Sequence, residues 1–104
     1  MYAVIFRSIR TTHSEDLYQE HSKKMDELVK SISGYISHYS QRDSKTKEGI
    51  TVSYFESLEA INKWREHPEH KKTQELGRTT FYSWYEIDLV KVERKYDWTL
   101  EDSE

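Results

Sequence analysis

The sequence predicts one α+β domain in which strands and helices follow one another in the order βαββαβ. Four segments rich in β-branched and aromatic residues are separated by two amphipathic segments with helical spacing and by one polar turn. A chain of 104 residues has room for one hydrophobic core, so this order describes a single domain. Right-handed connections would place both helical segments on the same face of a four-stranded antiparallel sheet.

The first strand is predicted at Tyr2–Arg10, which lacks any helix-capping signal. Successive residues of a strand point to opposite faces of the sheet. Apolar residues occupy both sets of alternate positions, Tyr2, Val4 and Phe6 in one set and Ala3, Ile5 and Ile9 in the other. Both faces of this strand are therefore expected to need cover.

The first helix is predicted to follow residues 11–14, which offer capping oxygens, and to end before Gly34. Glu15 and Asp16 place negative charge in its first turn, where the helix dipole favours it. The residues expected to face inward follow at helical spacing: Leu17, His21, Met25, Leu28, Val29 and Ile32.

A β-hairpin is predicted after this helix. Tyr35–Arg42 and Gly49–Phe55 have the composition of strands, and the polar residues 43–48 between them have the composition of a turn. Ile50, Val52 and Tyr54 would lie on one face of the second of these strands.

The second helical segment is predicted to be bent. It covers Glu56–Glu66 with Ser57 as a plausible N-cap, and it breaks at His67 because a residue before proline avoids the helical conformation. Pro68 suits the first position of a second helical piece, which runs to about Leu76 and is stopped by Gly77.

The last strand is predicted at about residues 83–94. Its apolar pattern changes phase, since Tyr85, Ile87 and Leu89 share one face whereas Val90 and Val92 share the other. This change predicts either a β-bulge near Leu89 or burial of both faces at different points. We assign residues 1–96 to the domain and residues 97–104 to an acidic C-terminal tail.

A homodimer is predicted from the face of the sheet that the helices leave bare. This face would carry apolar or aromatic residues on the first, third and fourth strands, more than the few hundred Å² that a monomer usually exposes. A second copy of the same sheet would cover it. The alternative is an aromatic surface that simply tolerates water, because many protein surfaces are apolar.

Composition excludes several classes of function. The 16 basic and 19 acidic residues are interspersed and give a net charge of -3, which argues against a nucleic-acid partner. No window is long and apolar enough to cross a membrane, and the start of the chain lacks the features of a signal peptide. Cysteine is absent, so no disulfide framework is expected and a cytoplasmic location fits. No phosphate-binding glycine loop and no hydrolase nucleophile motif is present.

Most of the chain resembles the antibiotic biosynthesis monooxygenase family, and in particular its small stand-alone bacterial members. The resemblance is densest in residues 49–64 and continues through His67-Pro-Glu-His70, Leu76-Gly-Arg78, Phe81-Tyr-Ser-Trp-Tyr85 and residues 92–96. It implies a ferredoxin-like fold and a dimeric α/β barrel, in which two sheets face each other and the last strand of each protomer reaches across its partner.

The resemblance implies two activities. One branch of this broad group oxidises electron-rich aromatic substrates with dioxygen and needs neither metal nor flavin. The other binds and degrades haem, with a first-strand Asn, a Trp in the second helix and a His ligand about three turns later. Trp64 matches the Trp, but Gln74 stands near the ligand position and Asn62 is the chain's one Asn. Haem degradation is therefore disfavoured, and no cofactor is expected.

Three histidines are candidates for a catalytic base: His67, His70 and His21. An imidazole titrates near neutral pH and can take a proton from a phenol or anthrone, which produces the electron-rich anion that reacts with oxygen. The alternatives are structural. His67 would be a helix boundary, His70 a partly exposed residue of the first turn, and His21 a buried side chain bonded to a backbone carbonyl or a Tyr. No third ligand has spacing that matches His67 and His70, so no metal site is expected.

Five residues are candidates for binding a small aromatic ligand: Trp64, Tyr54, Phe81, Trp84 and Arg78. The aromatic side chains could line a flat apolar cavity, or they could be ordinary core residues. Arg78 could stack on them or pair across a dimer interface. The leading hypothesis is thus a homodimeric cofactor-independent monooxygenase for a small aromatic or quinol-like substrate. The alternatives are a non-catalytic module that binds or senses a small ligand and, less favoured, a haem-binding protein.

Overall fold

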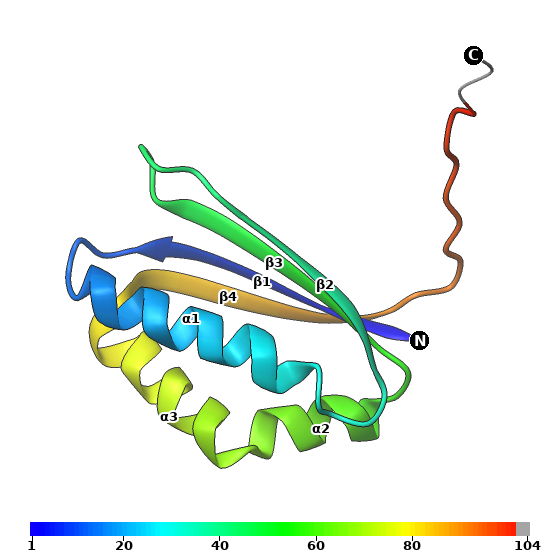
Figure 1. Cartoon of the computed structure of the whole chain (residues 1–104), viewed down its shortest axis with the longest axis horizontal. Coiled ribbons are helices and arrows are strands. Elements are labelled where there is room, and N and C mark those ends of the chain that lie inside the picture. The colour runs from blue at the N-terminus through cyan, green and yellow to red at the C-terminus, as the bar shows by residue number, and fades with distance from the viewer. Residues whose placement is uncertain (102–104) are drawn as a thin grey trace.

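The computed structural model of the chain, described here for residues 1–101, confirms the α+β class and the predicted order of elements (Figure 1). The described residues form three helices and four strands, and a short π-helical turn, η1, joins the last helix to the last strand. Their bounds are β1 Tyr2–Arg10, α1 Glu15–Val29, β2 Tyr35–Arg42, β3 Glu48–Phe55, α2 Leu58–Glu66, α3 Pro68–Leu76, η1 Gly77–Phe81 and β4 Tyr82–Lys91.

The four strands form one antiparallel sheet in the order β2-β3-β1-β4, and the helices pack on one of its faces (Figure 1). Val4 belongs to the core under the helices, and alternation places Phe6, Ser8 and Arg10 on the same side. Ala3, Ile5, Arg7 and Ile9 point the other way. We call that second face the open face.

The core lies between α1, α2 and the end of β3. Its buried residues are Val29, Phe55, Ala60 and Ile61, and around them pack Tyr2, Val4, Tyr35 and Trp64. Gly34 approaches this core closely with a φ of +95°, because a Cβ atom there would lie 2.6 Å from the Cβ of Ala60. Only glycine satisfies both conditions, so Gly34 fixes the turn between α1 and β2.

The predicted bend of the second helix is confirmed. Ser57 caps α2, with its hydroxyl oxygen accepting a hydrogen bond from the Ala60 N–H at 3.1 Å. His67 has extended backbone angles, φ −60° and ψ 129°, and Pro68 occupies the first turn of α3. The break turns the chain so that residues on either side of it, Trp64 and His70, meet.

The β-bulge predicted near Leu89 is wrong, and the alternative, burial of both faces of the last strand, is not seen in the single chain, where Ile87, Leu89 and Val90 are exposed. The β1–β4 register is regular through Leu89, and its irregularity lies between Ile9 and Arg10 instead.

Helix α3 ends at Leu76 with Gly77 as its C-cap, as predicted. Gly77 itself has helical angles, φ −57° and ψ −47°, and the chain continues through η1. A Cβ at Gly77 would lie 3.2 Å from the Tyr82 ring. This glycine allows a close approach to the ring, not a reversal of the chain.

The open face is uncovered in the single chain. Large apolar side chains exposed on it include Tyr39, Ile50, Trp84 and Val90. The sheet is open and is not itself a closed barrel, so the predicted dimeric barrel stays a prediction. No helix within residues 1–101 has the length and apolar character needed to span a membrane.

The two ends of the domain meet at one end of the sheet. The N–H of Val92 donates to the carbonyl of Met1 at 3.0 Å, which extends the β1–β4 ladder by one bond. Beyond it, residues 97–101 are exposed and belong to no helix or strand. The rest of the predicted acidic tail, residues 102–104, lies outside the described residues, so the boundary at residue 96 stays a prediction.

Candidate active site

His21 is held in one orientation by a chain of hydrogen bonds between α1 and α3. Its Nδ1 lies 3.0 Å from the hydroxyl oxygen of Thr73, and that hydroxyl donates to the carbonyl of Glu69 at 3.2 Å. Because the hydroxyl hydrogen is used on the carbonyl, Thr73 must accept from His21, and Nδ1 carries the hydrogen. Nε2 then bears the lone pair, and it has no hydrogen-bond partner within residues 1–101.

A cleft between α1 and α3 is open beside this imidazole. It is lined by His21, Lys72, Glu75, Leu76 and Thr79. The ring of Phe81, which is almost completely buried, lies 5.8 Å from the His21 ring, centroid to centroid. The His21 imidazole therefore borders the cleft, while the Phe81 ring packs behind it and does not line the cleft.

An aromatic cluster continues inward from Phe81 to the sheet. Tyr18 meets Phe81 edge to face at 5.5 Å and Tyr82 at 6.1 Å, and Phe6 meets Tyr82 at 5.3 Å. Burial raises the pKa of the Tyr82 hydroxyl well above its usual range. This cluster encloses Phe81 and packs behind His21.

His70 stacks on Trp64 across the bend between α2 and α3. The two rings are 4.1 Å apart and nearly parallel, and His70 Nδ1 lies 3.0 Å from the Trp64 carbonyl. Gln74 Nε2 lies 3.4 Å from the same nitrogen. Because the carbonyl can only accept, the shorter contact places the hydrogen on Nδ1. Burial lowers the pKa of His70, so this imidazole is neutral at pH 7.

His67 has a structural task. Its Nδ1 accepts a hydrogen bond from the Glu69 N–H at 3.2 Å and so caps the first turn of α3. The lone pair of Nδ1 is occupied by this bond, which leaves the hydrogen on Nε2 in the neutral ring. His67 is therefore less suited than His21 or His70 to accept a substrate proton.

The other residues predicted to bind a ligand are divided between the two faces of the sheet. Trp64 lies on the helix side with His70, and Phe81 lies beside His21. Tyr54 and Trp84 are paired with Ala3 and Ile9 and so lie on the open face, where Arg7 sits 5.8 Å from the Trp84 ring. Arg78 is exposed and donates to the Tyr85 hydroxyl at 3.4 Å. One chain does not bring these five side chains into one cavity.

Comparison with known proteins decides the family. Residues 1–76 match the family model described as antibiotic biosynthesis monooxygenase. The uncharacterized protein YqjZ of Bacillus subtilis is 38% identical over 94 residues, which are 90% of this chain and 81% of that protein. The chain belongs to the antibiotic biosynthesis monooxygenase family.

Solved structures share the fold of this monooxygenase-family chain. Rv0793 from Mycobacterium tuberculosis superimposes with a TM-score of 0.79 at 12% identity, over 92% of this chain and 98% of that one. SnoaB, a cofactor-independent oxygenase from Streptomyces nogalater, superimposes with a TM-score of 0.74 at 9% identity, over 90% of this chain and 94% of that one. At sequence identities this low, the similarity concerns the fold alone.

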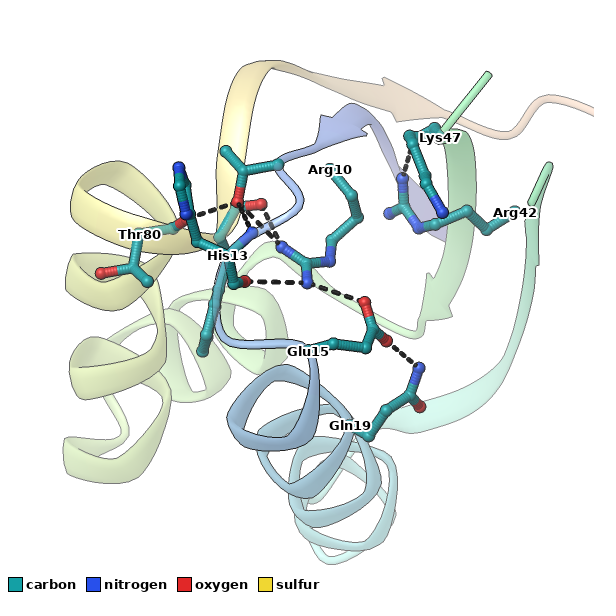
Figure 2. A network of polar contacts seen from close by, with 9 residues as sticks. Arg10, His13, Glu15, Gln19, Arg42, Lys47 and Thr80 are labelled. Atoms are coloured by element: carbon teal, nitrogen blue, oxygen red, sulfur yellow. Dashed lines mark hydrogen bonds and ion pairs between the residues drawn. The ribbon is translucent and has the colours of Figure 1, made fainter. Parts of the chain in front are cut away.

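Sequence reasoning missed a buried arginine at the edge of the site in this family member. Arg10 lies at the end of β1, and its guanidinium reaches the carbonyls of Phe81 and His13 and the carboxylate of Glu15, the last at 3.0 Å (Figure 2). A hydrogen bond from Gln19 and then the charge-assisted bond from Arg10 lower the pKa of Glu15. The signal was present, because Arg10 has the same alternation as Phe6 and Ser8, which face the helices.

Arg42 completes this polar edge of the monooxygenase-family fold. It donates to the Ser8 hydroxyl and to the Lys47 carbonyl, each at 2.7 Å (Figure 2 shows the Lys47 contact). Its guanidinium carbon lies 5.8 Å from the Tyr82 ring centroid. Arg10 thus joins the end of β1 to the loop before α1 and to the end of η1, and Arg42 joins β2 to β1 and to the turn before β3. Within residues 1–101 no group of three or more His, Asp or Glu side chains could hold a metal.

Proposed function

We propose that this protein is a homodimeric monooxygenase that oxidises a small aromatic or quinol-like substrate with dioxygen and without a cofactor. Membership of the antibiotic biosynthesis monooxygenase family supports oxygenase chemistry. The observation that carries the proposal is the His21 imidazole, which lines the α1–α3 cleft and is fixed by Thr73 so that Nε2 carries the lone pair.

The chemistry needs one base and no stored electrons, because the substrate supplies them. His21 Nε2 removes a proton from an acidic C–H or phenol O–H of the substrate. The anion passes one electron to dioxygen, and the two radicals combine into a peroxide. For a CH2 group, cleavage of the O–O bond with loss of water leaves a carbonyl, so that CH2 and O2 become C=O and H2O. The proton held by His21 leaves with that water.

The fixed tautomer of His21 is what suits it to this step. With its hydrogen on Nδ1 and directed to Thr73, the ring presents a lone pair on Nε2. Leu76 supplies the apolar side chain that lines the cleft with His21. His70 is the second candidate for the base, since it is also neutral, but among the described pockets the cleft is lined by His21 and not by His70.

The second copy would cover the open face. Tyr39, Ile50, Trp84 and Val90 are exposed there, which supports association of two sheets face to face. In that arrangement Tyr54 and Trp84 would contribute to the interface and not to the substrate cleft of their own chain. We place the dimer in the cytoplasm, where conditions are reducing, because a chain without cysteine does not depend on disulfide bonds.

Oxygen consumption tests this proposal. The purified protein is added to a panel of anthrones and quinols in an oxygen electrode, and we expect uptake with at least one of them. His21→Gln should lower kcat by about 10²-fold or more, the usual contribution of a general base. His13→Gln is the matched control, because the His13 side chain is exposed and contributes only its carbonyl to the Arg10 contact.

Three other results would count against parts of the proposal. No oxygen uptake by the wild-type protein, together with a ligand-induced rise in Tm, would favour a binding module over an enzyme. Uptake that His21→Gln leaves unchanged but His70→Gln abolishes would move the base to His70. A Soret band on titration with haem would favour the haem-binding alternative.

A further inference from the structure

A second row of titratable side chains lies away from the α1–α3 cleft, where β2 passes α1. His38 Nε2 is 3.1 Å from the carboxylate of Asp26, and His38 Nδ1 is 2.6 Å from the hydroxyl of Tyr35. The carboxylate can only accept, so in the neutral ring Nε2 carries the hydrogen and Nδ1 accepts from the phenol. Phenol, imidazole and carboxylate thus form one directed hydrogen-bonded row.

This row leads from the core to the surface. The Tyr35 ring packs against the buried core, edge to face with Phe55 at a centroid distance of 6.1 Å. Trp64 packs on the same core from α2. The His38 side chain is 14% exposed and that of Asp26 is 56% exposed, so the carboxylate end of the row reaches solvent.

The chemistry of a partly buried phenol explains what such a row can do. A phenol that loses an electron becomes a very strong acid, so its oxidation is easy only when a base already accepts its proton. Burial, and then the negative charge of Asp26, raise the pKa of Tyr35, so the phenolate is not available at neutral pH. His38 Nδ1 supplies the base in contact, and Asp26 stabilises the imidazolium that results.

We propose that Tyr35, His38 and Asp26 form a redox-active tyrosine site. When Tyr35 loses one electron, its hydroxyl proton moves to His38 Nδ1 and a neutral tyrosyl radical remains. The oxidant is an organic peroxyl radical, which takes the electron and one proton from solvent to become a hydroperoxide. When an external thiol or another reductant returns an electron to Tyr35, the proton returns from His38.

The use of this site rests on the proposed function, whereas its redox chemistry does not. An oxygenase that couples a substrate radical to dioxygen risks releasing peroxyl radicals inside the protein. A tyrosine that borders the core and passes its proton outward would reduce them before they damage other side chains. Tyr35 is distinct among the eight tyrosines, because within residues 1–101 no other tyrosine hydroxyl bonds to an imidazole.

Flash photolysis tests the site without any substrate. The full-length protein is mixed with a photo-oxidised ruthenium tris-bipyridine complex, and the tyrosyl radical is followed by transient absorption and freeze-quench EPR. Tyr35→Phe should remove most of the radical signal. Tyr39→Phe is the matched control on the same strand, since Tyr39 is exposed and points to the open face, and it should keep the signal.

Variants of the proton acceptor His38 and of its partner Asp26 test whether oxidation of Tyr35 depends on the hydrogen-bonded row or only on exposure of the ring. His38→Gln removes the base and should slow oxidation of Tyr35 roughly tenfold, which corresponds to about 1.4 kcal/mol of barrier. Asp26→Asn should slow the oxidation less. Both variants should show a smaller solvent deuterium isotope effect on the oxidation rate than the wild-type protein. Equal rates in wild type, His38→Gln and Tyr35→Phe would overturn the proposal. The photolysis experiment involves no oxygenase turnover. A negative oxygen-uptake assay would therefore contradict only the proposed enzyme activity, and a negative photolysis result only the redox-active tyrosine site.

Discussion

The guanidinium of Arg10 lies over the ring of Tyr18, with its central carbon 3.9 Å from the ring centroid. This contact joins the last residue of β1 to the second turn of α1 beneath the aromatic cluster. The Arg10 side chain is 2% exposed, so its charge is held by Glu15, by two carbonyls and by the ring face.

Removal of this guanidinium should destabilise the fold. Arg10→Met removes the guanidinium donor from the Phe81 and His13 carbonyls and from the Glu15 carboxylate, although the Phe81 carbonyl keeps its bond from the Thr11 N–H at 2.9 Å. We expect a loss of about 2 kcal/mol in the free energy of unfolding. Arg7→Met is the control, because Arg7 forms an exposed ion pair with Glu86 and should change stability by about 1 kcal/mol or less. Urea denaturation measures both. Equal losses in the two variants would contradict a special role for Arg10.

Gly34 and Ala60 should be energetically coupled. Gly34→Ala adds a methyl group 2.6 Å from the Ala60 Cβ and also strains a φ of +95°, so we expect a loss of about 3 kcal/mol or more. Ala60→Gly alone should cost about 1 kcal/mol through helix propensity. In the double variant the clash between the two methyl groups disappears. The loss of stability in the double variant should therefore be smaller than the sum of the losses in the two single variants. Strict additivity in the double-mutant cycle would show that the methyl contact is not the cause.

His70 should make stability depend on pH below neutrality. Burial lowers its pKa in the folded state, whereas the unfolded chain has an ordinary histidine pKa of about 6.5. Above that pH both states are neutral and His70 contributes no pH dependence. As the pH falls below about 6.5 the unfolded state binds the proton first, so stability is lost until the folded pKa is passed. In His70→Gln the free energy of unfolding should fall less between pH 7 and pH 5. An identical fall in both proteins would be evidence against the buried imidazole.

The open face should control association. Ile50→Glu places a charge among its apolar side chains, and we expect this variant to be a folded monomer by light scattering where the wild type is a dimer. Ile87→Glu is the matched control, because Ile87 is similarly exposed but pairs with Phe6 and lies on the helix side of the edge strand. A monomeric wild type would rule out the dimer, and dimers in both variants would place the interface elsewhere.

Much of the fold was predictable because local signals were strong. The Ser57 cap and the break before Pro68 follow from short-range rules, and both agree with the structure. Of the two explanations for the phase change in the last strand, the bulge near Leu89 is wrong. β4 is an edge strand of a regular ladder, and Ile87 and Leu89 remain exposed on it even though they face the helix side. Alternation predicts the face of a residue, but not whether anything covers that face.

The candidate site was less predictable, since it depends on partners that are distant in the sequence. The three histidines share one residue type, yet their hydrogen bonds separate them into a helix cap, a stacked neutral ring and an imidazole on the cleft. Neither the Thr73 contact of His21 nor the Asp26 contact of His38 has a local spacing signal, because each crosses between elements. The roles of Trp64, Tyr54, Phe81, Trp84 and Arg78 in ligand binding stay predictions.

The ladder bond between Val92 and Met1 has a practical consequence for protein engineering. Both ends of the domain emerge at the same end of the sheet, and a short peptide could join Met1 to the residues just after Val92 in a continuous backbone. New termini could then be opened in the exposed turn at residues 44–46, at the tip of the β2–β3 hairpin. A circularly permuted chain of this kind would carry fused reporter domains at the hairpin tip, and the former termini at the Met1 end of the sheet would be covalently joined.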